Sequence, residues 1–355
     1  MSRFCFGAVP ACVLFLAGVT PAQAAPGDTP TASREIVPVR KVALEGSGLP
    51  PIVVHRSGPS LVRLDFQGDS KRLFFVSNVD AAGRVGRWRP HAIEVATGAV
   101  ADHTPSDGTE YVGAAEHGPL FAGPDGLRAP DDPEFPAIAL GDRADVFLSP
   151  HTPHAVVCEL TGRSLKTSIV DLETRKATPV RMPGHHASAV AFAPDGRIAI
   201  ARASFTDGPD VASEGILVLA ADGSVVRRLP PATRGVRVLA FAAGGARLVY
   251  ADDRLHLVAL DTGEEIASAD AAPAFWADLG EDAAVSHDGR TIRIHDPATL
   301  QPVKEFALDA PVPADAPERI KERGGLLRAA LSKDGTLLAV ATFDAVHFLR
   351  IERGK

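Results

Sequence analysis

An all-β fold built from repeated β-hairpins is predicted for this chain of 355 residues, and three observations support the prediction. A short apolar run, a polar turn and a second apolar run recur, most clearly at 189–201, 238–250 and 328–340. The apolar runs are bounded by Gly, Pro and Asp, as strands usually are. No long segment keeps the periodicity of an amphipathic helix, so we expect few helices.

The spacing of the repeats predicts seven units. The last large apolar residue of each first strand serves as a marker, with Ala114 as a weaker one. The markers are Phe66, Ala114, Phe147, Phe192, Phe241, Leu279 and Leu331. Their mean spacing of about 44 residues lies within the ~40–50 residues of a propeller blade. We therefore predict a seven-bladed β-propeller of four-stranded antiparallel blades, with a six-bladed propeller as the alternative.

Single blades differ in how clearly the sequence marks their strands. The sixth blade is clear, with strands expected at 275–279, 283–286, 291–296 and 302–308. The second blade is the weakest, because prolines remove backbone donors where its third and fourth strands belong. These prolines are Pro124, Pro130, Pro133 and Pro136. Loss of this blade would produce the six-bladed alternative.

The two ends of the chain are expected to close the ring. The last blade ends with its third strand at 345–351, so its fourth strand must come from the N-terminal region. The candidates for that strand are 39–44 and 52–55. Pairing the two ends in one blade removes the open edges that a linear sheet would expose.

The first 24 residues predict a cleavable export signal. Arg3 is their only charged residue, an apolar stretch spans 13–17, and Ala22 and Ala24 are small residues where a signal peptidase reads. A membrane anchor is the alternative, but Pro10 interrupts the apolar run, which is shorter than the ~20 residues of a spanning helix. We expect cleavage after Ala24 and a periplasmic or secreted protein.

After cleavage, a disordered lead-in is expected at 25–36 and a single propeller domain at 37–355. Cys158 would be the one remaining cysteine, so an internal disulfide is not expected. Its apolar neighbours predict a small packed hydrophobic residue rather than a reactive thiol.

The net charge of −7 is mild, and the chain has no Lys/Arg tract. This pattern argues against a nucleic-acid or anionic-membrane partner. We expect a monomer that does not insert into a membrane and that binds another protein or a small ligand.

Two segments resemble the WD40-like family of β-propellers, including the propeller repeat proteins that bacteria export. Residues 286–296 are similar to the family's second turn and third strand, with His295 where a Trp would stand and Asp296 in place of its Asp. Gly184 and His185, followed by 189–196, are similar to its Gly-His and first-strand signature. The resemblance implies the fold over about residues 40–355, with an incomplete His–Ser/Thr–Asp–Trp network. It implies no single function.

Twelve histidines raise the question of a metal site. His151 and His154 are expected in a turn at the bottom of the ring, whereas His185 and His186 are expected in a blade connection at the top. Opposite faces cannot share one ion, so we expect neither a metal nor another cofactor. No nucleophile motif is present either.

The top face, built by blade connections and turns between second and third strands, is the predicted binding surface. Its long loops are expected at 78–90, 205–215 and 309–325. The candidate binding residues are Arg84, Arg87, Trp88, Arg89, Trp276, Asp278 and Arg323. Trp and Arg are enriched at interface hot spots, which favours a docking loop around Trp88. The alternative is that Trp88 packs against the first blade while the arginines face water.

The sequence thus predicts an exported, non-catalytic binding scaffold, with no catalytic residue identified. The alternative is a periplasmic propeller enzyme, such as a lactonase-like hydrolase or a dehydrogenase-type subunit. An enzyme needs several polar side chains that converge on the mouth of the central channel. Trp276, Asp278 and Arg237 are the nearest candidates for such a set.

Overall fold

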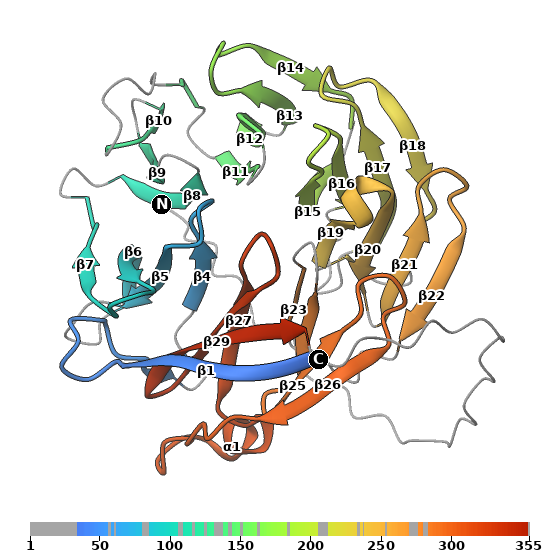
Figure 1. Ribbon diagram of the computed structural model, residues 1–355. Coiled ribbons are helices and arrows are strands. Elements are labelled where there is room, and N and C mark those ends of the chain that lie inside the picture. The colour runs from blue at the N-terminus through green and yellow to red at the C-terminus, as the bar shows by residue number, and fades with distance from the viewer. Residues whose placement is uncertain are drawn as a thin grey trace, which may run out of the picture.

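Seven antiparallel β-sheets form a ring in the computed structural model, in which the last blade lies beside the first (Figure 1). The structure describes residues 34–353, except 56–57, 60–61, 80–84, 106–108, 116–117, 124–125, 131–137, 141–143, 150–151, 162–163, 183–184, 205–211, 233–234, 237, 253, 270–275 and 280–282. The seven-bladed β-propeller is confirmed and the six-bladed alternative is wrong, because the second blade is present. The export signal lies outside the described residues.

The first four blades follow the chain from the innermost to the outermost strand. The first contains β4 (Val62–Phe66), β5 (Arg72–Val79), β6 (Val85–Glu94) and β7 (Val100–Asp102). The second contains β8 (Glu110–Ala115), β9 (Gly118–Gly123) and β10 (Gly126–Arg128). The third contains β11 (Ala144–Leu148), β12 (His154–Thr161), β13 (Ser164–Asp171) and β14 (Ala177–Val180). The fourth contains β15 (His185–Phe192), β16 (Ile198–Ser204), β17 (Ala212–Leu219) and β18 (Val225–Leu229).

The remaining blades repeat the plan. The fifth contains β19 (Val238–Ala242), β20 (Arg247–Ala251), β21 (Leu255–Ala259) and β22 (Glu265–Ala269). The sixth contains β23 (Trp276–Leu279), β24 (Ala284–His287), β25 (Thr291–His295) and β26 (Pro302–Ala307), close to the predicted positions. The seventh contains β27 (Leu326–Leu331), β28 (Leu337–Thr342), β29 (Ala345–Arg353) and β1 (Arg34–Ala43).

Little structure lies outside the blades in the described part of the chain. It comprises the hairpin of β2 (Val54–His55) and β3 (Gly58–Pro59), a 3₁₀ turn at Ala243–Gly245 and one short helix, α1 (Glu318–Arg323). No helix among the described residues is long and apolar enough to cross a bilayer.

The second blade is reduced at its outer edge, as its prolines predict. Its fourth position is a single bridge between Leu127 and Ile138, where the two residues exchange backbone hydrogen bonds of 2.7 and 3.2 Å. Gly126 precedes the bridge with a φ of +102°, and a Cβ there would lie 2.0 Å from the carbonyl oxygen of Ile138. This close approach of two backbones requires glycine.

The N-terminal strand closes the ring. β1 pairs antiparallel with β29 from Arg34 opposite Arg353 to Ala43 opposite Ala345, with a register shift after Pro38. The first candidate, 39–44, is therefore the closing strand and 52–55 is not. β1 also begins at Arg34, so the predicted lead-in is wrong at 34–36. Pairing with the whole length of β29 extends the strand beyond the apolar run that predicted it.

The hydrophobic core lies between neighbouring blades. Phe75 and Ile93 of the first blade cluster with Val346 and Phe348 of the seventh, and all four are fully buried. Cys158 is 6% exposed and belongs to the cluster between the third and fourth blades, so the prediction of a packed residue is confirmed. The thiol pKa is raised, mainly by burial. A single β-hairpin cannot bury its apolar face, and the neighbouring blade provides the surface that covers it.

The first strands of successive blades lie innermost and contact one another, for example β4 with β8 and β27. Because these strands all run in one direction, their N-terminal ends share one end of the ring with the turns between second and third strands. We call this end the top. α1, which connects the sixth and seventh blades, lies there: Arg290 of the β24–β25 turn donates to the Lys321 carbonyl at 3.2 Å.

Candidate functional site

The predicted docking loop is a strand for most of its length. Arg84 lies outside the described residues, but Arg87, Trp88 and Arg89 belong to β6, where Arg89 lies opposite Ser77 of β5. The loop prediction 78–90 is wrong at 78–79 and at 85–90, because β5 continues to Val79 and β6 begins at Val85. Pairing at Val85 and at Arg89, on either side of a register shift, holds this segment in the sheet.

Trp88 packs between blades. It is partly buried against a cluster formed by Phe74 and Val76 of the first blade and Tyr111 and Phe121 of the second. This position matches the packing interpretation of Trp88. A tryptophan held against a core contributes to stability whatever the neighbouring arginines bind.

Two further candidates lie on the innermost strand of the sixth blade. Trp276 begins β23 opposite His287, and Asp278 lies opposite Val285. Their side chains and all of Arg237 lie outside the described residues, so the place of these groups at the channel mouth stays a prediction. Arg323 is exposed at the end of α1, a short helix within the segment 309–325 that was predicted as a loop.

A polar group that the sequence did not single out lies on the innermost strands near the top. Arg63 and Asp65 project from the same side of β4, because they alternate with the buried residues Val62 and Leu64. Nε of Arg63 lies 3.0 Å from one carboxylate oxygen of Asp65 and 3.2 Å from the other. The side chain of Arg63 is 46% exposed, so solvent reaches it.

The second blade supplies the third member. The Tyr111 hydroxyl donates to Oδ2 of Asp65 at 3.0 Å, and the guanidinium carbon of Arg63 lies 5.6 Å from the centre of the Tyr111 ring. Tyr111 is 5% exposed, and burial and then the Asp65 charge raise its pKa well above the ordinary value. The hydroxyl therefore stays protonated and acts as a donor at neutral pH.

Gly113 gives Arg63 room against the second blade. A Cβ at this glycine would lie 3.5 Å from Nη2 of Arg63 and 3.0 Å from Leu148. The guanidinium therefore extends across the innermost strand of the neighbouring blade. Asp65 raises the pKa of Arg63, which stays charged.

The seventh blade supplies the fourth member, Arg328 of β27. Its Nε donates to the carbonyl oxygen of Val62 at 3.0 Å, so it contacts β4 from the side opposite Tyr111. Burial, followed by the like charge of Arg63, lowers the pKa of Arg328 to about 10. Arg328 is thus cationic at neutral pH. We call Arg63, Asp65, Tyr111 and Arg328 the inner cluster.

His287 lies beside this cluster, at the top end of β24. It is 1% exposed, and burial followed by the charge of Arg328 lowers its pKa to about 4. The backbone N–H of Gly289 donates to Nδ1 at 3.3 Å, so the ring proton of the neutral imidazole is on Nε2. Nε2 is buried and has no hydrogen-bond partner among the described residues.

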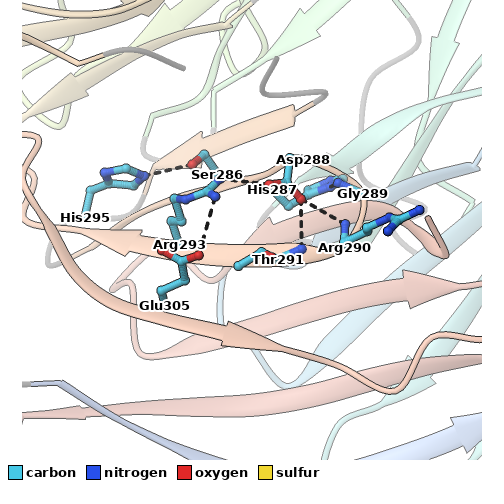
Figure 2. A network of polar contacts seen from close by, with 9 residues as sticks. All are labelled: Ser286, His287, Asp288, Gly289, Arg290, Thr291, Arg293, His295 and Glu305. Atoms are coloured by element: carbon cyan, nitrogen blue, oxygen red, sulfur yellow. Dashed lines mark hydrogen bonds and ion pairs between the residues drawn. The ribbon is translucent and has the colours of Figure 1, made fainter. Parts of the chain in front are cut away.

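The turn that follows His287 is held by Asp288 (Figure 2). One oxygen of Asp288 accepts from the backbone N–H of Arg290 at 3.0 Å and of Thr291 at 2.9 Å, and the other pairs with Arg293 at 3.1 Å. On the same two strands, the buried Ser286 hydroxyl lies 2.8 Å from Nε2 of the buried His295, and this contact joins β24 to β25. The backbone around His287 is thus fixed on both strands.

The histidines considered for a metal site are separated. His154 begins β12 at the bottom of the third blade, where Nδ1 lies 3.1 Å from the Thr152 hydroxyl. His185 and His186 begin β15 at the top, as strand residues rather than as the predicted connection. Within the described part of the chain, no three His, Cys, Asp or Glu residues lie close enough to hold a metal ion.

No protein-family model matches the sequence, and no curated protein matches it either.

The sequence contains one signal for the inner cluster. Arg63 and Asp65 alternate with apolar residues on a first strand, and Arg328 interrupts the apolar run 326–331. Charges on an innermost strand point to the axis or to a blade interface. Which of them meet depends on how the blades close into a ring.

Proposed function

We propose that this chain is an exported, non-catalytic scaffold of the WD40-like propeller type that binds a partner protein across its top face. The inner cluster is the observation that carries the proposal. It joins the first and last blades of the chain on the innermost strands, through the contact of Arg328 with the Val62 carbonyl, and it leaves Arg63 open to solvent. Exposed arginine beside buried aromatic rings is typical of binding hot spots.

Export is proposed from the charge and apolar pattern of the first 24 residues. The WD40-like relationship is supported by the contact of Ser286 with His295, since these residues stand at two positions of the family's polar network.

The scaffold is favoured over a propeller enzyme by the state of the polar groups near the axis. The carboxylate of Asp65 is engaged by both Arg63 and Tyr111, and the His287 imidazole is buried. A general base must reach the proton that it takes from a substrate. Neither group is placed for that task, whereas Arg63 is open to solvent and suited to binding.

Site-specific photo-crosslinking tests the proposal. A photoreactive amino acid replaces Arg323 on the top face, and Lys176, which is exposed on the β13–β14 turn at the bottom, is replaced in a matched control. Cells that export the protein are irradiated, and crosslinked partners are identified by mass spectrometry. We expect one partner to crosslink from position 323 and not from 176. A partner that crosslinks only from 176, or equally from both, would contradict top-face binding.

A further inference from the structure

We infer that the groove between the third and fourth blades, at the bottom end of the ring, binds the guanidinium group of a small ligand. The inference goes beyond the proposed function, which concerns the opposite face. The groove has a volume of about 520 Å³, which is within the size range of small-molecule sites. Its lining includes His154, Asp171, Lys176, Thr178, Ala221 and Asp222.

An arginine fills the equivalent place between the seventh and first blades. Arg40 of β1 donates to the carbonyl oxygen of Ala96 at 2.6 Å, in the turn between β6 and β7. Gly98, two residues further along, has a φ of +75°, and a Cβ there would lie 2.9 Å from Cδ of Arg40. The arginine side chain thus passes the glycine and reaches a carbonyl of the neighbouring blade.

The same contact recurs at two further interfaces. Arg227 of the fourth blade donates to the carbonyl of Asp261 in the fifth, and Arg247 of the fifth donates to the carbonyl of Ala298 in the sixth at 2.8 Å. Both acceptors lie in the turn between a third and a fourth strand. Each again stands two residues before a residue with a positive φ, which is Gly263 or Leu300.

Between the third and fourth blades, a threonine stands where the arginine would be. Gly223, in the turn between β17 and β18, has a φ of +81°, and a Cβ there would lie 3.1 Å from Cγ2 of Thr178 in β14. The carbonyl two residues earlier belongs to Ala221, and it accepts no hydrogen bond from any residue that the structure describes. Because threonine is much shorter than arginine, the groove stays open where a guanidinium lies at the other interfaces.

The polar groups of the groove favour a cation. The carboxylates of Asp171 and Asp222 belong to its lining, and both have a lowered pKa, mainly through the backbone N–H of Thr174 and through the side chain of Ser224, respectively. Both are therefore ionised at neutral pH, against one exposed ammonium, that of Lys176. A planar guanidinium has N–H donors on several sides, so it can donate to a carboxylate and to a carbonyl at once.

The test follows backbone amide resonances by NMR at low salt. The protein is titrated with L-arginine, with L-lysine, and with L-citrulline, which has a neutral urea group in place of the guanidinium. We expect saturable shifts of the Asp222 and Gly223 amides with arginine, weaker ones with lysine and none with citrulline. Gly98 and Gly263 lie at interfaces that an arginine of the chain already fills, so their amides are internal controls and should not shift.

A substitution can supply the missing guanidinium from within the chain. Thr178→Arg should abolish the shifts caused by free arginine and should raise the midpoint of thermal unfolding. Thr178→Val keeps the size of the side chain and should leave arginine binding unchanged.

A second variant keeps the test decisive if Thr178→Arg fails to fold. Asp222 is exposed, so Asp222→Asn should fold normally. It should weaken arginine binding about threefold, read from the Gly223 amide, because one carboxylate of the groove is lost.

Several results would overturn the guanidinium site. They are the absence of a saturable shift with arginine, equal shifts with citrulline, equal shifts at Gly98 and Gly263, equal binding by the Thr178→Arg and Thr178→Val variants, and unchanged binding in Asp222→Asn. None of them bears on the crosslinking from position 323, because the groove and the top face lie at opposite ends of the ring. The failure of this inference and the failure of the scaffold function are therefore distinguishable.

Discussion

Ser286 and His295 are joined by a buried hydrogen bond of 2.8 Å between Oγ and Nε2, which links the second and third strands of the sixth blade (Figure 2). Nδ1 of His295 lies 3.0 Å from the Leu300 carbonyl, which can only accept, so Nδ1 holds the ring proton and Nε2 accepts from Ser286. A Trp at position 295 could only donate. The contact therefore has the opposite polarity from one that a Trp at this position would make.

Ser286→Ala should destabilise the protein by about 1–3 kcal/mol, because it leaves the buried Nε2 of His295 without a partner. Urea unfolding followed by circular dichroism measures the loss. Ser188→Ala serves as a control, since among the described residues the Ser188 hydroxyl makes one contact, a long one of 3.4 Å with the Ala201 carbonyl. Equal losses in the two variants would show that the Ser286 bond adds nothing.

Stability should fall as the pH is lowered from about 6.5 to about 4, and His287 should account for a measurable part of that slope. The pKa of His287 is lowered to about 4 in the fold, so in this interval the unfolded chain binds the additional proton. The full effect is about 3 kcal/mol, present above pH ~6.5 and lost below pH ~4.

The slope is measured by urea unfolding at several pH values. Burial also lowers the pKa values of His91, His295 and His347, so the unaltered protein is compared with His287→Gln. We expect a shallower slope in the variant. Parallel slopes would mean that His287 does not titrate differently in the folded and unfolded chains.

The closing strand offers a matched pair of substitutions. Val42 and Val37 both belong to β1, but Val42 is 6% exposed in the core between the seventh and first blades, whereas Val37 is 37% exposed. Val42→Ala should cost about 2 kcal/mol through lost burial and a cavity. Val37→Ala should cost less than about 0.5 kcal/mol. Thermal unfolding measures the loss of stability in each variant. Similar losses in the two variants would contradict the packing of β1.

Gly126→Ala should disrupt the outer edge of the second blade. The added methyl would collide with the Ile138 carbonyl oxygen, which accepts the only bridge seen at the fourth position in the described residues. The control is Gly46→Ala, where φ is also positive at +75° but nothing lies within 4 Å of the new Cβ. Both variants carry the backbone penalty of a left-handed alanine, so the difference reports the collision.

Hydrogen exchange measures this difference locally. Faster exchange of the Leu127 and Ile138 amides in Gly126→Ala than in Gly46→Ala is expected, because these amides form the bridge. Unchanged exchange in both variants would show that the blade absorbs the methyl group.

The number of blades and most strand positions could be predicted because each repeat is specified by residues close together in the sequence. Alternating apolar residues and Asp-Gly turns specify a hairpin within about a dozen residues, as in the sixth blade. The extent of β6 and β1 could not be read in this way. The sequence alone suggests a loop at Arg87, Trp88 and Arg89 and a polar lead-in at 34–36. Both segments are strands in the structure, because the strands beside them provide backbone partners.

By itself, the sequence determined that the chain forms hairpins that must stack, because none can bury its apolar faces alone. Only the tertiary structure decided which polar residues meet. Arg328 and Val62 lie 266 positions apart in the chain, and they touch because β1 completes the last blade and brings β27 against β4. Ring closure depends on the summed geometry of all seven sheets, so no local pattern reveals that Arg63 and Arg328 are neighbours.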